Sequence, residues 1–592
     1  MAHKPLTSTA EFVQKLKENN ELFEFTDSID PNLELAEFQR QVSARKGPGL
    51  LFTNVKGTQF PVATNLFGST RRMELAFGHR PAKFIQDLAE TALNLMPPSP
   101  KKLWEAKGLA LEGLKVGLKN KKTGPVLAGK IEPVDLTLLP QIKSWPEDGG
   151  PFVTLPLVYT ESPTTGKGNL GMYRIQLFDQ TTAGMHIQIH RGGGYHYHEA
   201  EQLGQALPAR IFVGGPPALT IAAVAPLPED IPELVFASLL MGERLTVARA
   251  DDLGSRMAVQ ADFMISGVIP PKVRRPEGPF GDHYGYYSLQ HDYPQLNVQS
   301  LHHRKDAIWA ATVVGRPPQE DHYIAEYLQE LLEPLFPLVM NQVKKVWAYE
   351  ESGVHSLAGA LVKNRYPKEA FTAALRILSE GQLSLTKFLL ITDCDVNVKD
   401  FAALLTAVLE RADLTTDLFV LSNISQDTLD YTGPAVNSGS KAILMGLGDK
   451  KRDLVKNWEG PFVEPKLNHA ELFCPGVLCV GGVPYDMDPD LATKLADEPS
   501  IQNFSWVVLL DDPKDAVSSN ESFIWHCFTR FEPAADIYGK QRVHRFHIGI
   551  EGPVVIDARM KPWYPKVLTP DPDVVKGVEA KWGALLDKIC PE

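Results

Sequence analysis

Short apolar runs separated by Gly and Pro fill the middle of this chain, whereas both ends mix helical and strand-like patterns. The central runs lie at residues 152–159, 173–178, 187–190, 209–213, 218–223 and 263–269. Each run is rich in residues that favour strands, and turn-forming residues lie between successive runs. Many short strands with turns between them predict a β-barrel for this part of the chain.

The N-terminal pattern is that of a small α/β domain. Residues 7–45 follow a helical pattern with acidic positions, and Thr7-Ser8-Thr9 offers hydroxyl groups that can cap a helix start. Strand-like runs follow at residues 49–54 and 60–66. We therefore expect helix and strand to alternate before the central region begins.

The C-terminal pattern is again α/β, and part of it occurs twice. After a helical stretch at residues 321–348, residues 386–393 form an apolar run that ends in an acid, which is typical of a buried parallel strand. A helix is expected at 401–412. The same succession returns about 119 residues later, with a strand at 505–512 and a helix at 523–531. Residues 533–538 likewise match 414–419, so we predict a partial internal duplication.

These patterns together predict an α/β protein of several domains. We expect an N-terminal α/β domain at residues 1–120, a β-rich catalytic domain at 121–318, a helical linker at 319–345 and an oligomerisation domain at 346–592 that contains the repeat. Residues 505–563 are expected to extend a sheet or widen a contact between subunits. The final segment, 574–589, has apolar residues at helical spacing, which could contact a neighbouring subunit or its own domain. A homo-oligomer is the expected assembly.

Composition narrows the range of partners. The chain has 592 residues, 44% hydrophobic content and a net charge of −12, which argues against nucleic acid as a ligand. Its most basic stretch, residues 115–122, is predicted to be a solvated loop rather than a binding site for nucleic acid. We find neither an apolar run of membrane-spanning length nor a signal-peptide core, so we expect a cytoplasmic protein. The five cysteines lack a CxxC pair, as expected for reduced thiols.

The strongest candidate for chemistry is the stretch Arg275-Pro-Glu-Gly-Pro-Phe-Gly-Asp-His-Tyr-Gly-Tyr-Tyr287. Gly278 and Gly281 can adopt backbone angles closed to other residues, and Pro279 fixes one dihedral angle. Stiff chain therefore sets the separation of Glu277 and Asp282, as proton transfer requires. The alternative interpretation is an acidic surface turn.

This stretch resembles the hallmark E-x-P-[FY]-G-[DE] of the UbiD family of reversible aromatic-acid decarboxylases. Further matching blocks occur in family order: Phe60 to Gly68, Asn169 to Arg174, His190 to Gly193, and Gly439-Ser440-Lys441. Together the blocks cover roughly residues 10 to 445. The resemblance implies a split β-barrel that binds prenylated FMN, a cofactor made by a separate flavin prenyltransferase.

The resemblance also implies the catalytic residues. Arg174 would bind the substrate carboxylate with its planar fork, and Glu277 and Asp282 would complete an acid network. Asp282 is expected to donate the proton, with Glu277 holding Arg174. A carboxyl buried over a flavin should have a raised pKa, which would let it act as an acid near neutral pH.

Asn169, His190 and Glu233 match the family's divalent-metal ligands, and their mixed amide, imidazole and carboxylate donors suit Mn²⁺ or Mg²⁺ better than zinc. The resemblance implies that this metal ion binds the phosphate of the prenylated FMN, and that a potassium ion lies near the same phosphate. Two further acids, Glu229 and Asp230, lie close to Glu233 in the sequence. Each of these acids, taken alone, is also typical of a solvated acid at the start of a helix. The cofactor would further contact Leu170, Gly171, Met172, Tyr173, Arg174, Arg191, Ala223, Val224, Ala225, Pro226 and Lys441.

Two rival functions remain open. His196 and His198, two residues apart with acids nearby, would share one face of a strand and could begin a cupin-like metal site of an oxygenase. A noncatalytic flavin-binding homologue is the second rival. Within the family interpretation, a quinone-pathway hydroxybenzoate or naphthoate is the favoured substrate. Decarboxylation of simple phenolic or heteroaromatic acids during degradation is the alternative.

Overall fold

The computed structural model describes residues 4–95, 99–188, 192–228, 231–249, 251 and 253–590. Contacts divide the chain into two compact units, the first made of Met1–Gly315, Gln319–Leu331 and Val567–Glu592, and the second of Arg316–Pro318 and Leu332–Lys566. The mixed α/β class expected from the sequence is confirmed. The four-part division at residues 120, 318 and 345 stays a prediction.

The first unit begins with a small sheet of strand order β1-β2-β3-β19. Its strands are β1 (Leu22–Phe25), β2 (Gly49–Phe52), β3 (Val62–Thr64) and β19 (Trp309–Ala310). Helix α1 (Thr9–Glu18) begins where Ser8 accepts a hydrogen bond from the Glu11 backbone, so the predicted hydroxyl cap is confirmed. Helix α2 (Glu34–Ala44) completes this N-terminal part.

A second, larger sheet of ten strands carries the candidate site. Its path runs β6-β9-β10-β18-β14-β11-β7-β8, with β15 and β5 also pairing with β18. The bounds are β5 (Gly129–Lys130), β6 (Phe152–Val153), β7 (Leu157–Glu161), β8 (Gly168–Met172), β9 (Ile175–Leu177), β10 (Thr182–Met185), β11 (Leu207–Val213), β14 (Phe263–Ile269), β15 (Arg274–Glu277) and β18 (His291–His303). Among the described residues the path does not close on itself, so the split barrel stays a prediction.

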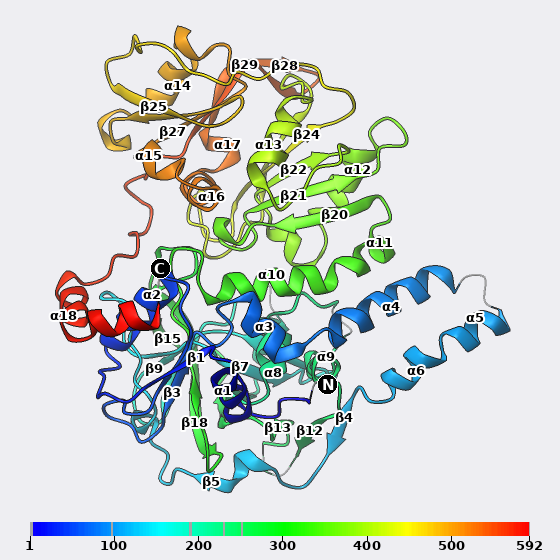
Figure 1. The fold of residues 1–592 in the computed structure, drawn as a ribbon, viewed down its shortest axis with the longest axis vertical. Helices are drawn as coiled ribbons and strands as arrows, with labels where there is room; N and C mark the ends of the chain where they lie inside the picture. Colours follow the sequence, from blue (N-terminus) through cyan, green and yellow to red (C-terminus); the bar gives the residue numbers. More distant parts are fainter. Residues whose placement is uncertain are drawn as a thin grey trace. The chain divides into compact units, whose positions relative to one another are not determined.

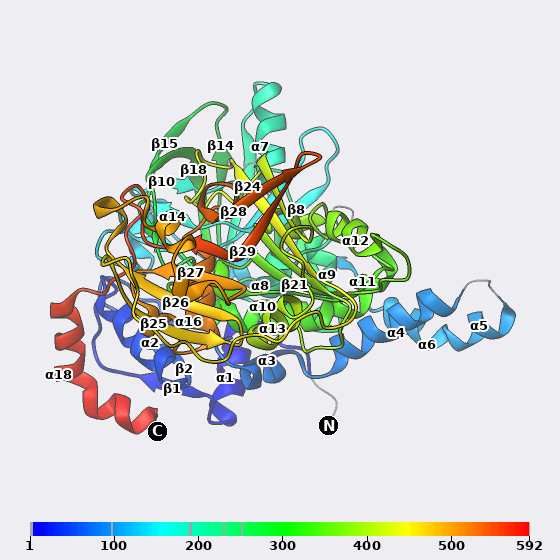
Figure 2. The same ribbon diagram turned by 90° about the horizontal axis from the view of Figure 1, so that it is seen from above.

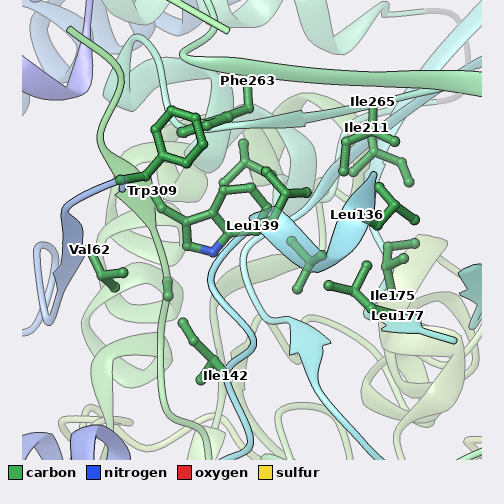
Figure 3. Packing of buried hydrophobic residues seen from close by; sticks show 14 of the residues in the cluster. Val62, Leu136, Leu139, Ile142, Ile175, Leu177, Ile211, Phe263, Ile265 and Trp309 are labelled. Atoms are coloured by element: carbon green, nitrogen blue, oxygen red, sulfur yellow. The ribbon is translucent and has the colours of Figure 1, made fainter. Parts of the chain in front are cut away.

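The core of the first unit lies between this sheet and the small one. Figure 3 shows the Trp309 indole at its centre, with Leu139, Phe263 and Ile265 around it. The rings of Trp309 and Phe263 meet edge to face at 4.9 Å. One hydrophobic core therefore joins strands from the N-terminal sheet and the ten-stranded sheet.

Three predicted elements are wrong in whole or in part. Of the strand expected at 187–190, Ile187 and Gln188 lie in no strand, and residues 189 and 190 lie outside the described residues. Residues 218–223, expected as a strand, lie in helix α8 (Pro217–Val224), because Pro217 suits the first helical position and alanines favour helix. The helix expected at 321–348 ends early. Helix α10 (Glu320–Leu332) and the short α11 (Phe336–Val339) are followed by strand β20 (Val343–Ala348).

The second unit contains the predicted duplication. Its two five-stranded sheets have the orders β20-β21-β22-β24-β23 and β25-β26-β27-β29-β28, with the same succession of antiparallel, parallel, parallel and antiparallel pairs (Figure 1). The strands of the first are β20, β21 (Leu357–Val362), β22 (Phe388–Thr392), β23 (Leu418–Ile424) and β24 (Gly439–Gly446). Those of the second are β25 (Leu467–Cys474), β26 (Val477–Gly482), β27 (Trp506–Leu510), β28 (Ile537–His544) and β29 (His547–Asp557). We call residues 343–446 the first repeat and 467–557 the second repeat.

The C-terminal helix α18 (Pro572–Ile589) packs within the first unit, although the sequence analysis assigned its residues to the C-terminal domain. Its apolar face contacts α2, and the Trp582 ring lies 5.1 Å from Phe25 and 5.9 Å from Phe38. The Trp582 indole N–H donates to Asp27 at 3.0 Å. This face is therefore used within the chain.

Helices α4 (Arg80–Asn94), α5 (Pro100–Glu105) and α6 (Lys107–Gly113) extend from the first unit, with α4 and α6 side by side (Figure 2). Within the predicted basic loop, residues 118–120 form strand β4 (Leu118–Asn120), and Lys115, Lys119, Lys121 and Lys122 are exposed. In the part of the chain that the structure describes, no helix is both long and apolar enough to cross a membrane.

Candidate functional site

The acidic loop lies between strands β15 and β17 (Tyr287–Ser288), with β16 (Phe280–Gly281) paired to β17. Gly278 adopts a φ of +92°, which only glycine takes readily, and its N–H donates to the Gln176 side chain at 2.9 Å. The Gly281 N–H donates to Asp148 at 2.7 Å. A Cβ at Gly281 would lie 2.0 Å from the Trp145 ring. The expected special backbone angle is therefore confirmed for Gly278 and wrong for Gly281, which has an ordinary φ and is required by the nearby Trp145 ring.

Arg174, which lies just after β8, brings the two acids of the loop together. Its Nε and Nη2 donate to the two carboxylate oxygens of Glu277 at 2.8 and 2.9 Å, in a bidentate pair. Its Nη1 donates to Asp282 at 2.5 Å, and Nη2 also donates to Ser288 at 2.8 Å. The three residues predicted as catalytic thus form one contact network.

This network is almost completely buried, and its opposite charges stabilise one another in their ionised forms. Glu277 has no exposed area, Asp282 is 7% exposed and Arg174 is 8% exposed. Burial alone would raise the pKa of Glu277, but the Arg174 guanidinium and the contact with His186 together outweigh burial and lower that pKa to about 2. The pKa of Asp282 is also lowered, against burial, by His283 and then by Arg174. The acids in turn raise the pKa of Arg174.

The raised carboxyl pKa expected from the sequence is therefore wrong for the protein as described. Both acids are ionised at neutral pH, because a cation lies within hydrogen-bonding distance of each. Residue types alone cannot give the sign of this shift, since it depends on the distance between acid and guanidinium.

His186 is a member of this site that sequence reasoning missed. Its Nδ1 lies 3.2 Å from a Glu277 carboxylate oxygen, and its ring packs 4.2 Å from that of Tyr293. Its Nε2 is buried and has no hydrogen-bond partner among the residues that the structure describes. Burial and the nearby Arg174 cation lower the pKa of His186, so the ring is neutral at neutral pH. The orphaned nitrogen can accept or donate one further hydrogen bond.

Of the three predicted metal ligands, Glu233 contacts the backbone of the strand that carries Asn169. Asn169 is on β8, and Glu233 begins helix α9 (Glu233–Met241). A Glu233 oxygen accepts the N–H of Leu170, the neighbour of Asn169, at 3.0 Å. Burial raises the pKa of Glu233, and a cation bound beside the carboxylate would oppose this effect of burial. The third ligand, His190, and the predicted phosphate contact Arg191 lie outside the described residues.

The other predicted cofactor contacts surround this pair. Tyr173 is buried, and its hydroxyl accepts hydrogen bonds from Asn169 and from the Gly193 N–H, each at 3.3 Å. A Cβ at Gly192 would lie 2.1 Å from the Asn169 side-chain oxygen. Helix α8, which packs on β8, ends in the predicted phosphate segment, and that segment is at least partly exposed. Its residues are Ala223, Val224, Ala225 and Pro226. Gly171 and Met172 continue β8 toward Arg174.

Lys441 belongs to the second unit, where it lies buried on β24. Its ammonium donates to the Thr386 carbonyl at 2.8 Å. Burial lowers its pKa to about 8, against the opposing effect of Asp430 and Asp427. Its expected contact with the cofactor stays a prediction.

The cupin alternative depended on His196 and His198 sharing a strand face, and this expectation is wrong. Both lie in helix α7 (Gly192–Gln202), where a spacing of two residues turns side chains to different faces. His196 is buried and its Nδ1 lies 2.8 Å from the Thr160 hydroxyl, while His198 is exposed. The pair does not form a metal site.

Three domain models of one family match the chain. The 3-octaprenyl-4-hydroxybenzoate carboxy-lyase N-terminal domain matches residues 13–92, the Rift-related domain of the same family (UbiD) matches 118–317, and the C-terminal domain matches 322–446. A Chlamydia pneumoniae protein named as a subunit of 4-hydroxybenzoate decarboxylase is 44% identical over 577 residues, which is 97% of each chain.

Two solved structures show the same fold at low identity. The closed form of Sedimentibacter hydroxybenzoicus vanillic acid decarboxylase has a TM-score of 0.66 and 22% identity, covering 78% of this chain and 96% of that one. An evolved dimeric form of the UbiD-class enzyme HmfF from Pelotomaculum thermopropionicum, in complex with prFMN, has a TM-score of 0.61 and 22% identity. It covers 76% of this chain and 97% of that one.

Proposed function

The chain belongs to the UbiD family of carboxy-lyases, and from this membership we propose that it is a prenylated-FMN-dependent, reversible, non-oxidative decarboxylase of aromatic or α,β-unsaturated acids. The observation that carries the proposal is the buried guanidinium of Arg174, held by two carboxylates on a loop fixed by glycine. A cation that can bind a carboxylate lies next to groups that can transfer a proton.

Arg174 binds and orients the substrate carboxylate before the carbon–carbon bond breaks. Glu277 holds the guanidinium through its bidentate pair, so a substrate carboxylate competes chiefly for the side of Arg174 that faces Asp282. A second carboxylate near Asp282 raises the pKa of Asp282 by like-charge repulsion. Asp282 then carries the proton that replaces CO2 on the carbon atom.

The residues present fit the cofactor and its metal. Asn169 and Glu233 offer an amide oxygen and a carboxylate on adjoining elements, which suits Mn²⁺ or Mg²⁺ bound to a phosphate. Glycines at 192 and 193 let the backbone approach Asn169 and Tyr173 closely, because a Cβ there would lie 2.1 and 3.0 Å from those side chains. When bound, the prenylated flavin supplies the electron sink that no side chain here provides. Potassium at the phosphate, supply by a flavin prenyltransferase and a cytoplasmic homo-oligomer are part of the proposal.

For the substrate we propose a hydroxybenzoate or naphthoate precursor of ubiquinone or menaquinone. The relatives named for 4-hydroxybenzoate and vanillic acid support a phenolic acid. They favour equally the second candidate, a decarboxylase of simple phenolic acids in degradation. Retention of the whole Arg174, Glu277 and Asp282 network argues against a noncatalytic flavin-binding homologue.

The test is CO2 release from a panel of acids by protein produced together with a flavin prenyltransferase. The panel contains 4-hydroxybenzoate, vanillate, a dihydroxynaphthoate and a polyprenylated hydroxybenzoate. We expect release from at least one acid, loss of release in Arg174→Gln, and normal release in Arg275→Gln, since Arg275 is an exposed neighbour. Protein that carries the modified flavin yet releases no CO2 from any acid contradicts the proposal.

A further inference from the structure

The two repeats of the second unit share one hydrophobic core. Each sheet has its own cluster on its outer face, with α12 (Glu369–Ile377) covering the first and α14 (Leu491–Ala496) covering the second. A third cluster lies between the sheets and takes members from both repeats. In it, the Phe388 ring lies 5.7 Å from Trp506 and 5.6 Å from Phe528. The repeats therefore meet through their inner faces.

The polar contacts between the repeats are reciprocal. In one direction, the Ala534 N–H at the 533–538 turn of the second repeat donates to the Ser440 hydroxyl on β24 at 2.9 Å. In the other, the Leu414 carbonyl at the equivalent turn of the first repeat accepts the Ile550 N–H of β29 at 3.1 Å. Strands β24 and β29 occupy the same place in their sheets. Equivalent parts that contact one another both ways are typical of a twofold dimer interface.

We propose that the second repeat is a built-in subunit. It occupies, within the same chain, the position that a second copy of the first repeat would take in a twofold dimer, so this face is closed to other chains. The sequence-based expectation that residues 505–563 widen a contact between subunits changes accordingly. A homo-oligomer of this protein must form through other faces.

The covalent link favours this arrangement strongly. Residues 447–466 join the two repeats, and a short link gives an effective concentration on the order of 1 mM for the second repeat at the first. At micromolar protein, pairing within the chain is favoured about a thousandfold over pairing between chains.

The built-in subunit differs from the first repeat in its chemistry. Matching the first residues of β22 and β27, Phe388 and Trp506, makes their register partners Ala442 and Val554 equivalent, so that Pro553 stands at the place of Lys441. At its end the second repeat instead has the buried Asp557, which pairs with Arg559 just beyond the repeat at 2.7 Å. Met445 and Leu447 stand at these places at the end of the first repeat. The second repeat contacts the strand that carries Lys441 through the Ala534–Ser440 hydrogen bond, and β29 has no lysine at the place of Lys441.

Disulfide trapping in the full chain tests this proposal. Ser440→Cys with Ala534→Cys, in a Cys394→Ser background that removes the only partly exposed cysteine, is oxidised mildly at about 1 and 50 μM. We expect a cross-link inside single chains at both concentrations, measured by non-reducing electrophoresis, mass spectrometry of the linked peptides and thiol counting. Each single cysteine variant serves as the control for chance oxidation.

The reciprocal pair, Leu414→Cys with Ile550→Cys, provides a second measurement. Circular dichroism establishes that each variant is folded. Disulfide-linked dimers that increase with concentration would show that repeats pair between chains and would overturn the proposal. Failure of both folded pairs to cross-link would overturn it too, because the contacts would then be absent in solution. Oxidised and reduced protein should have the same native mass by light scattering.

Discussion

Replacing Glu277 by Gln removes one negative charge from the buried network while keeping the side-chain shape. Arg174 then has a single carboxylate partner, Asp282, and part of the bidentate pair becomes a contact with an amide N–H that cannot accept. Breaking a buried pair in this way costs roughly 3–5 kcal/mol of stability. We expect the guanidinium to turn toward Asp282 and turnover to fall at least tenfold, which corresponds to ~1.4 kcal/mol in the barrier.

The stability effect should depend on pH with a definite sign. The pKa of Glu277 falls from 4.5 to about 2 on folding. Its contribution is therefore complete above about pH 4.5 and is lost as the pH falls toward about 2. At ~1.4 kcal/mol per pKa unit, the shift is worth about 3 kcal/mol. Urea unfolding at pH 7 and pH 3 should show this loss in the wild type and a smaller loss in Glu277→Gln.

The matched control is Glu201→Gln. Glu201 also binds an arginine through two oxygens, Arg274 at 2.8 and 3.1 Å, but that arginine side chain is 38% exposed. Exposed pairs contribute ~1 kcal/mol or less, so this variant should keep its activity and most of its stability. The reasoning is refuted if Glu277→Gln keeps more than about a tenth of wild-type CO2 release, or if the two variants lose equal stability.

Three shorter predictions follow from the same contacts. His186→Asn should shift the pH profile of kcat and lower kcat more than it changes KM, whereas a purely structural role would leave the profile in place. Glu233→Gln should lose manganese and flavin together by elemental analysis and absorbance, with Glu199→Gln as control; full cofactor without metal would contradict the assigned ligand. Trp582→Ala should lower the free energy of unfolding by about 3–5 kcal/mol, because it leaves a cavity where the Trp582 ring of α18 packs against Phe25 in the hydrophobic core of the first unit. An unchanged urea midpoint would contradict this packing.

Parts of the fold and site could be predicted because local chemistry determines them. The loop needs glycine at 278 because the backbone has a positive φ there, and a Gly-Pro pair in a turn indicates such a position, whereas the Trp145 ring that requires Gly281 could not be predicted. The duplication was also predictable, since buried parallel strands have a strong apolar signature. Residues 218–223 were not, because a short apolar run fits a strand and a buried helix equally well.

What could not be predicted depends on distances between segments far apart in the chain. Nothing in the run Met185-His186-Ile187 distinguishes His186 from a core histidine until Glu277, 91 positions away, is placed beside it. The helical spacing of α18 predicted an apolar face but not its partner, because an amphipathic pattern carries no information about what covers it. The lowered pKa of Glu277 could not be predicted either, because it depends on the distance from Glu277 to Arg174, which lies 103 positions away in the chain.

The ionised acids also constrain how an anionic substrate can enter. Arg174 contributes one positive charge and Glu277 and Asp282 two negative charges, while His186 is neutral, so these four groups sum to −1, and His283 beside Asp282 is a further group that can take up a proton. A carboxylate substrate adds a second net negative charge in a site nearly free of water, which is unfavourable unless a proton is taken up. We therefore predict uptake of about one proton per bound acid.

Titration calorimetry of a substrate analogue in two buffers with different ionisation enthalpies measures this uptake between pH 6 and 8. Apparent affinity should fall as the pH rises, because the incoming proton becomes scarcer. Asp282→Asn removes both the charge and its acceptor, so binding in that variant should lose most of its proton uptake even though turnover fails. Binding to the wild type without proton uptake would refute the argument, since the extra negative charge would then be carried by groups other than those around Arg174.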